Sequence, residues 1–370
     1  MKIGTVKELK MDESRVGIIP SGAEILMEQG HSVYIQSEAG LNSGFMDQDY
    51  AEIGAIILKD AKEVWEQCDM IIKVKEPQEI EYLSIRKGQI LLTYFHFAAS
   101  KKLTNAVIQS KCSAIAYETV RARDGSLPLL KPMSEVAGRM SIQEGAKYLE
   151  KAHGGRGILL GGVPGVAPAT VVVLGAGVVG THAVKMAAGL GSLVYVLDTN
   201  LERLRYLSDL MPNNVITLLS NPLNIRNTLK NADLVVSSIL IPGAKAPKLI
   251  KKKTLKSMKS GAVIIDVAID QGGSTETSKP TTHARPTYKV DEIIHYCVAN
   301  MPGAMPLTST IALTNATIRY AESIANLGIK KALSLDPYLA MGLSTHLGHV
   351  CCPQVAAAFN YKHVDWRTVV

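Results

Sequence analysis

Residues 169–198 read ATVVVLGAGVVGTHAVKMAAGLGSLVYVLD, and this stretch decides the fold of the chain. It begins with a run of β-branched residues, turns at the glycines between Gly175 and Gly180, and continues for one helix length to Gly191. A second apolar run then ends at Asp198. This order of strand, glycine turn, helix and strand predicts a βαβ unit.

The glycine turn, Gly175-Ala176-Gly177-Val178-Val179-Gly180, matches the pattern G-x-G-x-x-G. The pattern alone indicates little, because glycine turns are common, but between a strand and a helix it predicts a dinucleotide site. Glycines let the backbone approach a pyrophosphate at the helix N-terminus, and the acid that ends the second strand accepts hydrogen bonds from ribose hydroxyls. The alternative is a glycine turn that only packs the helix on the strand.

Asp198, the acid at the end of the second strand, also indicates which dinucleotide binds. A carboxylate at this position repels the 2′-phosphate of NADP, so we predict NAD as the cofactor. Arg203 and Arg205 follow closely and could soften this repulsion.

Strand-length and helix-length segments alternate on both sides of this unit, which predicts largely parallel sheets and an α/β fold. The first series of predicted strands is 2–6, 32–35, 55–58, 70–74, 90–95 and 114–116, and the second is 170–174, 192–197, 215–219, 234–237, 262–267 and 294–298.

The chain is predicted to form two domains. A proline-punctuated stretch, residues 127–132, precedes a helical segment, and we place the boundary there. Residues 129–305 are expected to be a Rossmann-type NAD-binding domain inserted into a discontinuous α/β substrate domain, residues 1–128 and 306–370. Helices predicted at 309–327 and 337–343 would return to that first domain; the alternative is a separate helical cap.

Composition narrows the class of protein. The chain has 370 residues, 47% of them hydrophobic, and a net charge of +7, but its one dense basic run, Lys251-Lys252-Lys253, suits a solvated helix face better than a nucleic-acid site. The five cysteines form no C-x-x-C pair, so neither a zinc site nor a disulfide framework is indicated. We expect a cytoplasmic enzyme with small-molecule substrates and no nucleic-acid or membrane partner.

Four polar residues follow predicted strands, where ligands bind in open α/β sheets. They are Arg15, Lys75, His96 and Asp270. Each has a structural alternative: the two cations as surface charges, His96 as a buried histidine between two phenylalanines, and Asp270 as a turn residue. As a set, they suggest a cleft between the domains.

The chemistry of this set is coherent. Two cations can hold a carboxylate and a carbonyl, while a histidine and a carboxylate can exchange protons as a hydride moves to nicotinamide. This describes a hydroxy-acid or amino-acid dehydrogenase. His346 and His349 could ligate a metal if they were helical, but a structural role is favoured, and no metal is predicted.

The sequence resembles the alanine dehydrogenases over nearly its whole length. The stretches that carry the resemblance are Lys7-Glu8, Glu13-Ser14-Arg15-Val16, Lys73-Val74-Lys75-Glu76-Pro77, Thr93-Tyr94-Phe95-His96, Lys131 to Gly138, Gly161 to Val166, Asp266 to Gly273 and His295 to Pro302.

The resemblance implies reversible, NAD-dependent oxidative deamination of L-alanine to pyruvate and ammonium by a homohexamer. It also implies that Arg15 and Lys75 bind the substrate carboxylate and carbonyl. His96 and Asp270 would transfer protons and handle the water that hydrolyses the imine, and the choice of principal base between them stays open.

Cofactor contacts are also implied by the resemblance. They would come from Ser134, Gly175, Gly177, Val178, Val179, Gly180, Asp198, Arg203, Ser220, Ile239, Leu240, Val267, Ala268, Ile269, Asp270, Lys279, Val298, Ala299, Asn300 and Met301.

A few positions depart from the family pattern. Lys279 and Leu307 stand where arginine is usual, His182 where asparagine is common, and Ala284-Arg285 where acids are usual. Lys279 keeps the positive charge of the usual arginine but cannot form its bidentate hydrogen bonds. We therefore expect these departures to affect ligand affinity or assembly more than the type of reaction.

Two other functions remain as alternatives. One is the nucleotide-binding part of a proton-translocating transhydrogenase; against it, no membrane helices occur before Val370, and Arg15, Lys75 and His96 are retained. The other is a non-catalytic NAD-binding scaffold descended from the enzyme.

Overall fold

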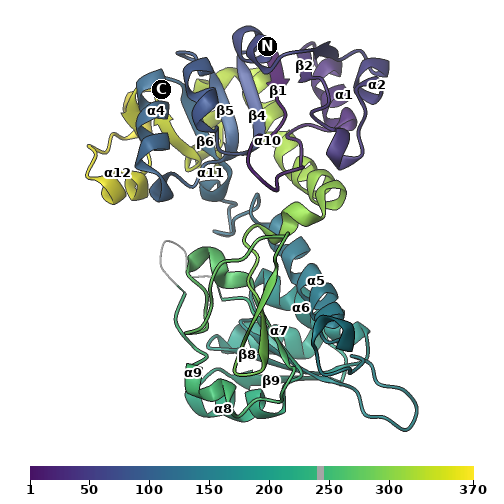
Figure 1. Cartoon of the computed structure of the whole chain (residues 1–370). Coiled ribbons are helices and arrows are strands. Elements are labelled where there is room, and N and C mark those ends of the chain that lie inside the picture. Colours follow the sequence, from purple (N-terminus) through teal and green to yellow (C-terminus); the bar gives the residue numbers. More distant parts are fainter. Residues whose placement is uncertain (240–245) are drawn as a thin grey trace. The chain divides into compact units, whose positions relative to one another are not determined.

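The computed structural model describes residues 1–239 and 246–370 (Figure 1). These residues form two compact units. The first contains residues Met1–Met133 and Gly303–Val370, and the second contains Ser134–Pro302. Each has its own sheet, and the predicted α/β class with largely parallel sheets is confirmed.

The first unit contains an eight-stranded sheet in the order β15-β14-β6-β5-β4-β1-β2-β3. All neighbouring pairs from β3 to β6 are parallel. The strands are β1 (Lys2–Thr5), β2 (Ser32–Gln36), β3 (Ile56–Leu58), β4 (Met70–Lys75), β5 (Ile90–Tyr94), β6 (Ser113–Ala116), β14 (Leu343–His346) and β15 (His349–Val350). Its helices are α1 (Pro20–Glu28), α2 (Asp47–Glu52), α3 (Ala61–Gln67), α4 (Lys101–Ser110), α10 (Pro306–Leu335), α11 (Pro337–Ala340) and α12 (Pro353–Phe359).

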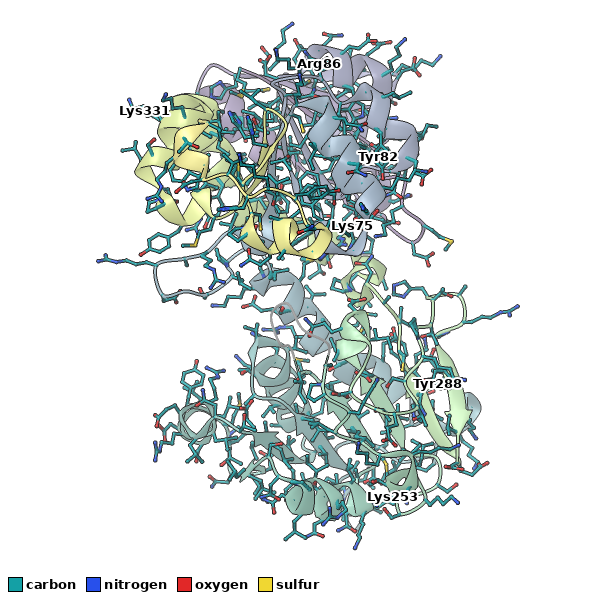
Figure 2. All side chains as sticks on the ribbon, turned by 90° about the vertical axis from the view of Figure 1, so that its left-hand side faces the viewer. Lys75, Tyr82, Arg86, Lys253, Tyr288 and Lys331 are labelled. Carbon is teal, nitrogen blue, oxygen red and sulfur yellow. The ribbon has the colours of Figure 1, made fainter. Side chains whose placement is uncertain are left out.

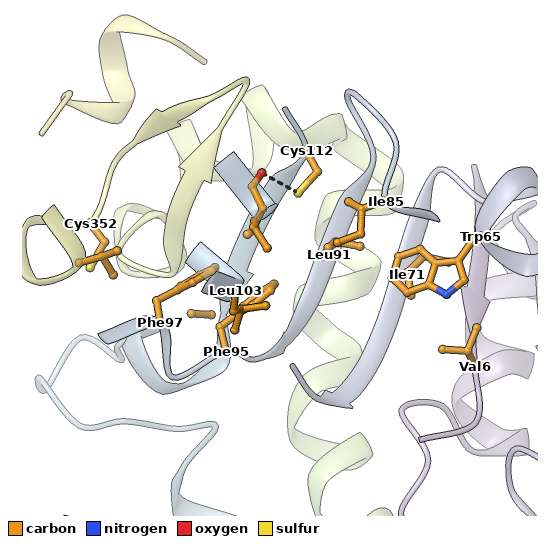
Figure 3. Close-up of a cluster of buried hydrophobic side chains, with 14 of the residues drawn as sticks. Val6, Trp65, Ile71, Ile85, Leu91, Phe95, Phe97, Leu103, Cys112 and Cys352 are labelled. Carbon is orange, nitrogen blue, oxygen red and sulfur yellow. Dashed lines mark hydrogen bonds between the residues drawn. The ribbon is translucent and has the colours of Figure 1, made fainter. Parts of the chain in front are cut away.

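Burial on both faces explains the apolar strands at the centre of this sheet. All five residues of β5 and the first five of β4 are buried. One cluster joins Trp65 of α3 and Leu103 of α4 to side chains of β4 and β5, and Cys352 near the C-terminal end also belongs to it (Figure 3). Residues from both segments of the unit therefore share one core.

The C-terminal part of the first unit differs from the sequence prediction. The helix expected at 309–327 is longer, since α10 extends to Leu335 across a non-helical residue, Gly328. The helix expected at 337–343 ends at Ala340, and after a two-residue turn the chain forms β14, which pairs antiparallel with β6. This strand was not predicted.

The second unit contains a seven-stranded sheet in the order β12-β13-β11-β10-β7-β8-β9. Only the edge strand β12 is antiparallel to its neighbour. The strands are β7 (Thr170–Leu174), β8 (Leu193–Asp198), β9 (Val215–Leu219), β10 (Leu234–Ser237), β11 (Val263–Asp266), β12 (Thr287–Val290) and β13 (Ile293–Tyr296). Its helices are α5 (Lys131–Tyr148), which begins three residues before the unit, α6 (Val178–Gly189), α7 (Leu201–Leu210), α8 (Pro222–Asn231) and α9 (Lys252–Leu255).

The order of the parallel strands β9-β8-β7-β10-β11-β13 is that of a doubly wound dinucleotide-binding sheet, with the switch point between β7 and β10. The strands predicted at 170–174, 215–219 and 234–237 coincide with β7, β9 and β10. Strand β12 was not predicted. Among the helices described here, none is both long and apolar enough to cross a membrane.

Candidate active site

Three of the predicted substrate and catalytic residues lie at one edge of the first sheet. Arg15 is in the loop after β1, Lys75 is the last residue of β4, and His96 is the second residue after β5. These three strands are adjacent and parallel, in the order β5-β4-β1, so their carboxyl ends share an edge. Figure 2 labels Lys75 at the lower edge of this unit. The fourth residue, Asp270, belongs to the second unit.

Arg15 is 2% exposed and is held by a carboxylate from its own loop. Its Nε and Nη2 donate to the two oxygens of Glu13, at 2.6 and 2.5 Å, and Nη1 lies 2.8 Å from the sulfur of Met133. Despite desolvation, this pair raises the pKa of Arg15, so the guanidinium stays charged. The sequence alternative of a surface charge is wrong for Arg15.

Lys75 is half-buried, and its ammonium forms no hydrogen bond or ion pair with the residues described here. Burial, followed by the positive charge of Arg15, lowers the pKa of Lys75. A lysine with a lowered pKa gives up its proton more readily, so Lys75 can both bind an anion and donate a proton to a carbonyl oxygen.

A buried ion cluster holds the end of β4 in place. Lys73, 2% exposed, lies 3.3 Å from an oxygen of Glu8 and donates to Glu81 at 3.0 Å. The other oxygen of Glu8 accepts hydrogen bonds from the backbone N–H groups of Val74 and Lys75, at 2.7 and 3.3 Å. Glu8 therefore connects the buried cation to the backbone that carries Lys75.

His96 has a left-handed backbone conformation, with φ 50° and ψ 42°, which is uncommon for a residue other than glycine. The carboxylate of Glu118, in the 3-10 helix after β6, accepts from the N–H of His96 at 2.6 Å and from the N–H of Phe95 at 3.2 Å. His96 is exposed and its ring stacks on that of Tyr94 at 6.1 Å, so the alternative of a buried histidine is wrong. Strain of this kind is concentrated at functional sites.

Replacing Glu118 by glutamine should lower kcat for the chain's reaction by roughly tenfold, because an amide oxygen replaces a charged acceptor that serves two N–H groups. Binding of the predicted cofactor should not change, since Glu118 lies in the first unit and the predicted cofactor turn lies in the second. Steady-state kinetics and titration with the predicted cofactor measure the two effects. Glu38→Gln is the matched control. It removes an exposed carboxylate from a residue whose backbone is left-handed, as that of His96 is. A Glu118→Gln enzyme with wild-type kcat would contradict this positioning role.

In the second unit, the predicted cofactor residues gather at the carboxyl edge of the sheet. The turn 175–180 follows β7, Asp198 ends β8, and Ser220 follows β9, where its N–H donates to the carbonyl of Asp198 at 2.8 Å. Ile239 follows β10, while Val267, Ala268, Ile269 and Asp270 follow β11, and Val298, Ala299, Asn300 and Met301 follow β13. Leu240 lies outside the described residues.

The geometry of the glycine turn fits a pyrophosphate. Gly175 has φ 101°, and a Cβ on Gly180 would lie 1.8 Å from the oxygen of Gly175, so the fold itself requires these two glycines. A Cβ on Gly177 would meet none of the described residues within 4 Å, so the described part of the fold does not require this one. Gly177 is the N-cap of α6 and, among the described residues, no side chain caps this twelve-residue helix, whose first-turn N–H groups favour an anion.

Asp198 and Arg203 brace this turn. Asp198 accepts from the N–H of Ala176 at 2.6 Å and from that of Asn200 at 2.8 Å. The guanidinium of Arg203 donates to the carbonyl of Ala176 and to the hydroxyl of Thr181 at 2.9 to 3.0 Å. Arg203 is therefore engaged with the turn, and Asp198 is the charged group at the end of β8.

Asp270 lies in a short 3-10 helix, Val267–Gln271, which a buried acid organises. Asp266 accepts from the backbone N–H groups of Ala268 and Ser274, at 3.2 and 2.9 Å. A Cβ on Gly273 would lie 2.8 Å from Asp266 Oδ2, so only glycine fits there. Asp270 itself is exposed.

The last two predicted cofactor residues, Ser134 and Lys279, lie in other elements of the second unit. Ser134 lies in α5, one turn before Gly138, where a Cβ would lie 2.3 Å from the oxygen of Val179. The helix therefore contacts the first turn of α6. Lys279 lies in the loop before β12, and its N–H donates to the hydroxyl of Tyr288 at 2.7 Å.

Sequence reasoning missed the carboxylates that hold the predicted residues. Glu13 and Glu8 lay inside quoted motifs, but nothing in their spacing identified their partners. Glu118 follows β6 at the same sheet edge as His96, and a search of strand ends could have found it. His346, considered as a metal ligand, is in β14 opposite His349, and its Nδ1 lies 2.8 Å from the hydroxyl of Ser113.

Two family models match the chain. The model described as Alanine dehydrogenase/PNT, N-terminal domain, matches residues 4–137, and the model described as Alanine dehydrogenase/PNT, C-terminal domain, matches residues 141–353.

Relatives of known name match over nearly the whole chain. An alanine dehydrogenase of Methanococcus maripaludis is 55% identical over 364 residues, 98% of each chain. A solved L-alanine dehydrogenase structure has a TM-score of 0.95 at 49% identity and covers 97% of this chain and 99% of its own. A transhydrogenase of Sinorhizobium meliloti has a TM-score of 0.83 at 22% identity, over 95% of this chain and 100% of its own, which shows the fold alone.

Proposed function

Since the chain belongs to the alanine dehydrogenase/PNT family, we propose that it is an NAD-dependent alanine dehydrogenase, which converts L-alanine reversibly to pyruvate and ammonium. The observation that carries this proposal is the placement of Arg15, Lys75 and His96 at the ends of three adjacent parallel strands. Two cations beside a proton-transfer group suit a substrate that has a carboxylate and a carbonyl or amine on neighbouring carbons.

The carboxyl edge of the second sheet would hold NAD, whose nicotinamide would supply the acceptor for a hydride from Cα of alanine. In this proposal, the backbone N–H groups of the turn 175–180 bind the pyrophosphate of NAD. Asp198 accepts a hydrogen bond from a ribose hydroxyl and disfavours a 2′-phosphate. Ser134, Arg203, Ser220, Ile239 and Lys279, together with the turns 267–270 and 298–301, complete the proposed cofactor set.

The residues of the first unit bind and orient the substrate. Arg15 holds the carboxylate, as the buried and permanently charged member of the set. Lys75 binds the carbonyl oxygen of pyruvate, and its lowered pKa favours donation of a proton to that oxygen. His96, held by Glu118, and Asp270 exchange protons with the amine and with the water that hydrolyses the imine.

We assign substrate binding to residues 1–128 and 306–370 and cofactor binding to residues 129–305. We also propose that the chain forms a homo-oligomer, a hexamer by resemblance to its family. Exposed apolar side chains on residues 159–166 support this assignment, since Leu159, Val163 and Val166 are 68%, 51% and 59% exposed. A cytoplasmic location is supported by the five cysteines, all of which are buried and free.

The transhydrogenase alternative is not favoured. Identity to the transhydrogenase structure is 22%, against 49% to the L-alanine dehydrogenase structure. The non-catalytic scaffold is not favoured either, because a scaffold would not need the buried charges that support Lys75 and Arg15.

The purified protein should form NADH from NAD and L-alanine at alkaline pH and consume NADH with pyruvate and ammonium. Calorimetry should give a dissociation constant for NADH at least about tenfold below that for NADPH, because a carboxylate in the role proposed for Asp198 repels a 2′-phosphate. No turnover in either direction would refute the enzyme, and NADH binding without turnover would support the scaffold. Tighter binding of NADPH would refute the assignment of the cofactor.

A further inference from the structure

The first unit contains a basic pocket, and none of the described residues proposed for alanine or NAD lines it. Its volume is about 300 Å³, and three separate segments form it. Arg121 and Arg123 come from the loop after the 3-10 helix Tyr117–Thr119, Arg319 and Tyr320 come from α10, and Tyr338 comes from α11. We call it the arginine pocket.

The charges around the arginine pocket are unbalanced. Among the described residues, three guanidinium groups line it, and Asp336 is the one lining acid. Asp336 is engaged elsewhere, because its Oδ1 accepts from the backbone N–H groups of Tyr338 and Leu339 at 2.9 and 3.0 Å and caps α11. Within residues 1–239 and 246–370, none of the three arginines forms an ion pair. Like charges around one concavity repel each other, and a bound anion relieves that repulsion.

Two of the arginines are held in place without an anion. The guanidinium of Arg319 donates to the hydroxyl of Tyr320 at 2.6 Å and lies 4.5 Å from the centre of its ring. The backbone N–H of Arg121 donates to the carbonyl of Tyr338 at 3.2 Å, which joins the loop to α11. The loop closes on itself through a hydrogen bond from the N–H of Ala122 to the oxygen of Ser126 at 2.9 Å. For these two arginines, though not for Arg123, little ordering is therefore left for a ligand to impose.

We propose that the arginine pocket binds a small anion through a phosphoryl group. Each guanidinium can donate two parallel hydrogen bonds to the oxygens of a phosphoryl group. The charges of three guanidinium groups also suit a dianionic phosphoryl group better than a singly charged carboxylate. The volume is at the lower limit for small-molecule sites, so it suits a phosphoryl group on a short carbon skeleton, and not a dinucleotide. Tyr320 and Tyr338 supply the apolar wall for that skeleton.

Isothermal titration of the full-length protein with inorganic phosphate, and separately with glycerol 3-phosphate, tests the proposal. Both titrations are made with and without saturating NADH, since a phosphate could also occupy the glycine turn at Gly177. We expect binding that persists with NADH and is about tenfold weaker in Arg319→Gln and in Arg123→Gln. Arg123 is exposed and makes no bond within the described part of the chain, so its replacement disturbs no contact.

The matched control is Lys331→Gln, which removes an exposed cation from the same helix, α10 (Figure 2). Its affinity for both probes should equal that of the wild type. The absence of binding in the wild type, or equal affinity in the arginine variants and the control, overturns the proposal. Binding that NADH abolishes also overturns it. The comparison of the arginine variants with the control does not require the protein to bind NADH. The proposal for the arginine pocket can therefore fail while the proposed function holds, and the reverse.

Discussion

Replacing His96 by alanine should lower kcat for alanine oxidation by about 10²- to 10⁴-fold, the usual contribution of a positioned proton-transfer group. His96 is exposed at the carboxyl edge of the first sheet, and Glu118 fixes its backbone there. NADH binding should stay unchanged, because the glycine turn lies in the other unit. Steady-state rates with L-alanine and NAD, and titration with NADH, measure the two effects.

His31→Ala is the control for this experiment. His31 precedes β2, so it lies at the opposite edge of the same sheet, where its Nε2 is 2.8 Å from the amide oxygen of Asn326. Its loss removes an imidazole without changing the strand ends that carry Arg15 and Lys75. A near-normal rate in His96→Ala would refute the assigned role, and an equal loss in both variants would show that the effect is structural.

Replacing Lys73 by methionine should destabilise the first unit by about 3–5 kcal/mol, since it leaves two carboxylates buried without their cation. Lys73, Glu8 and Glu81 have side chains that are at most 5% exposed. Urea unfolding followed by the fluorescence of the two tryptophans, Trp65 and Trp366, measures this loss, as both lie in the first unit. Turnover should fall as well, because Glu8 also holds the backbone of Lys75.

The effect of Lys73→Met should depend on pH. Burial already raises the pKa of Glu8, and removal of the nearby cation would raise it further. The folded state then binds this proton more tightly than the unfolded state, so stability falls as the pH rises above the ordinary carboxyl range. The deficit relative to wild type should be full at neutral pH and smaller at acid pH.

Lys102→Met is the matched control for the buried cluster. Lys102 pairs with Glu79, and both side chains are about two-thirds exposed, at 66% and 67%. An exposed pair contributes roughly 0–1 kcal/mol, so this variant should unfold near the wild-type midpoint. Equal midpoints for Lys73→Met and Lys102→Met, or a deficit for Lys73→Met that does not vary with pH, would contradict the buried-charge account.

Most of the second unit could be predicted from the sequence because its signals are local. A Cβ on Gly180 would collide with Gly175, only five residues away. Because this requirement for glycine is local, it appears in the sequence as a short motif. The buried run of β7 and the acid that ends β8 flank it. Strand β14 is harder to predict in this way, since besides the two-residue strand β15 its partner is β6, more than 200 residues earlier.

Taken by itself, the sequence determined the α/β class, the parallel strands, the glycine turn and which polar residues follow strands, because each depends on neighbours along the chain. How those residues are held depends on contacts between distant parts of the chain. Glu118 is 22 residues from His96, and Glu8 is 66 residues from Val74. Hydrogen bonds over such separations leave no period in a sequence, so the strained histidine, the buried cation and the arginine pocket became visible only in the folded chain.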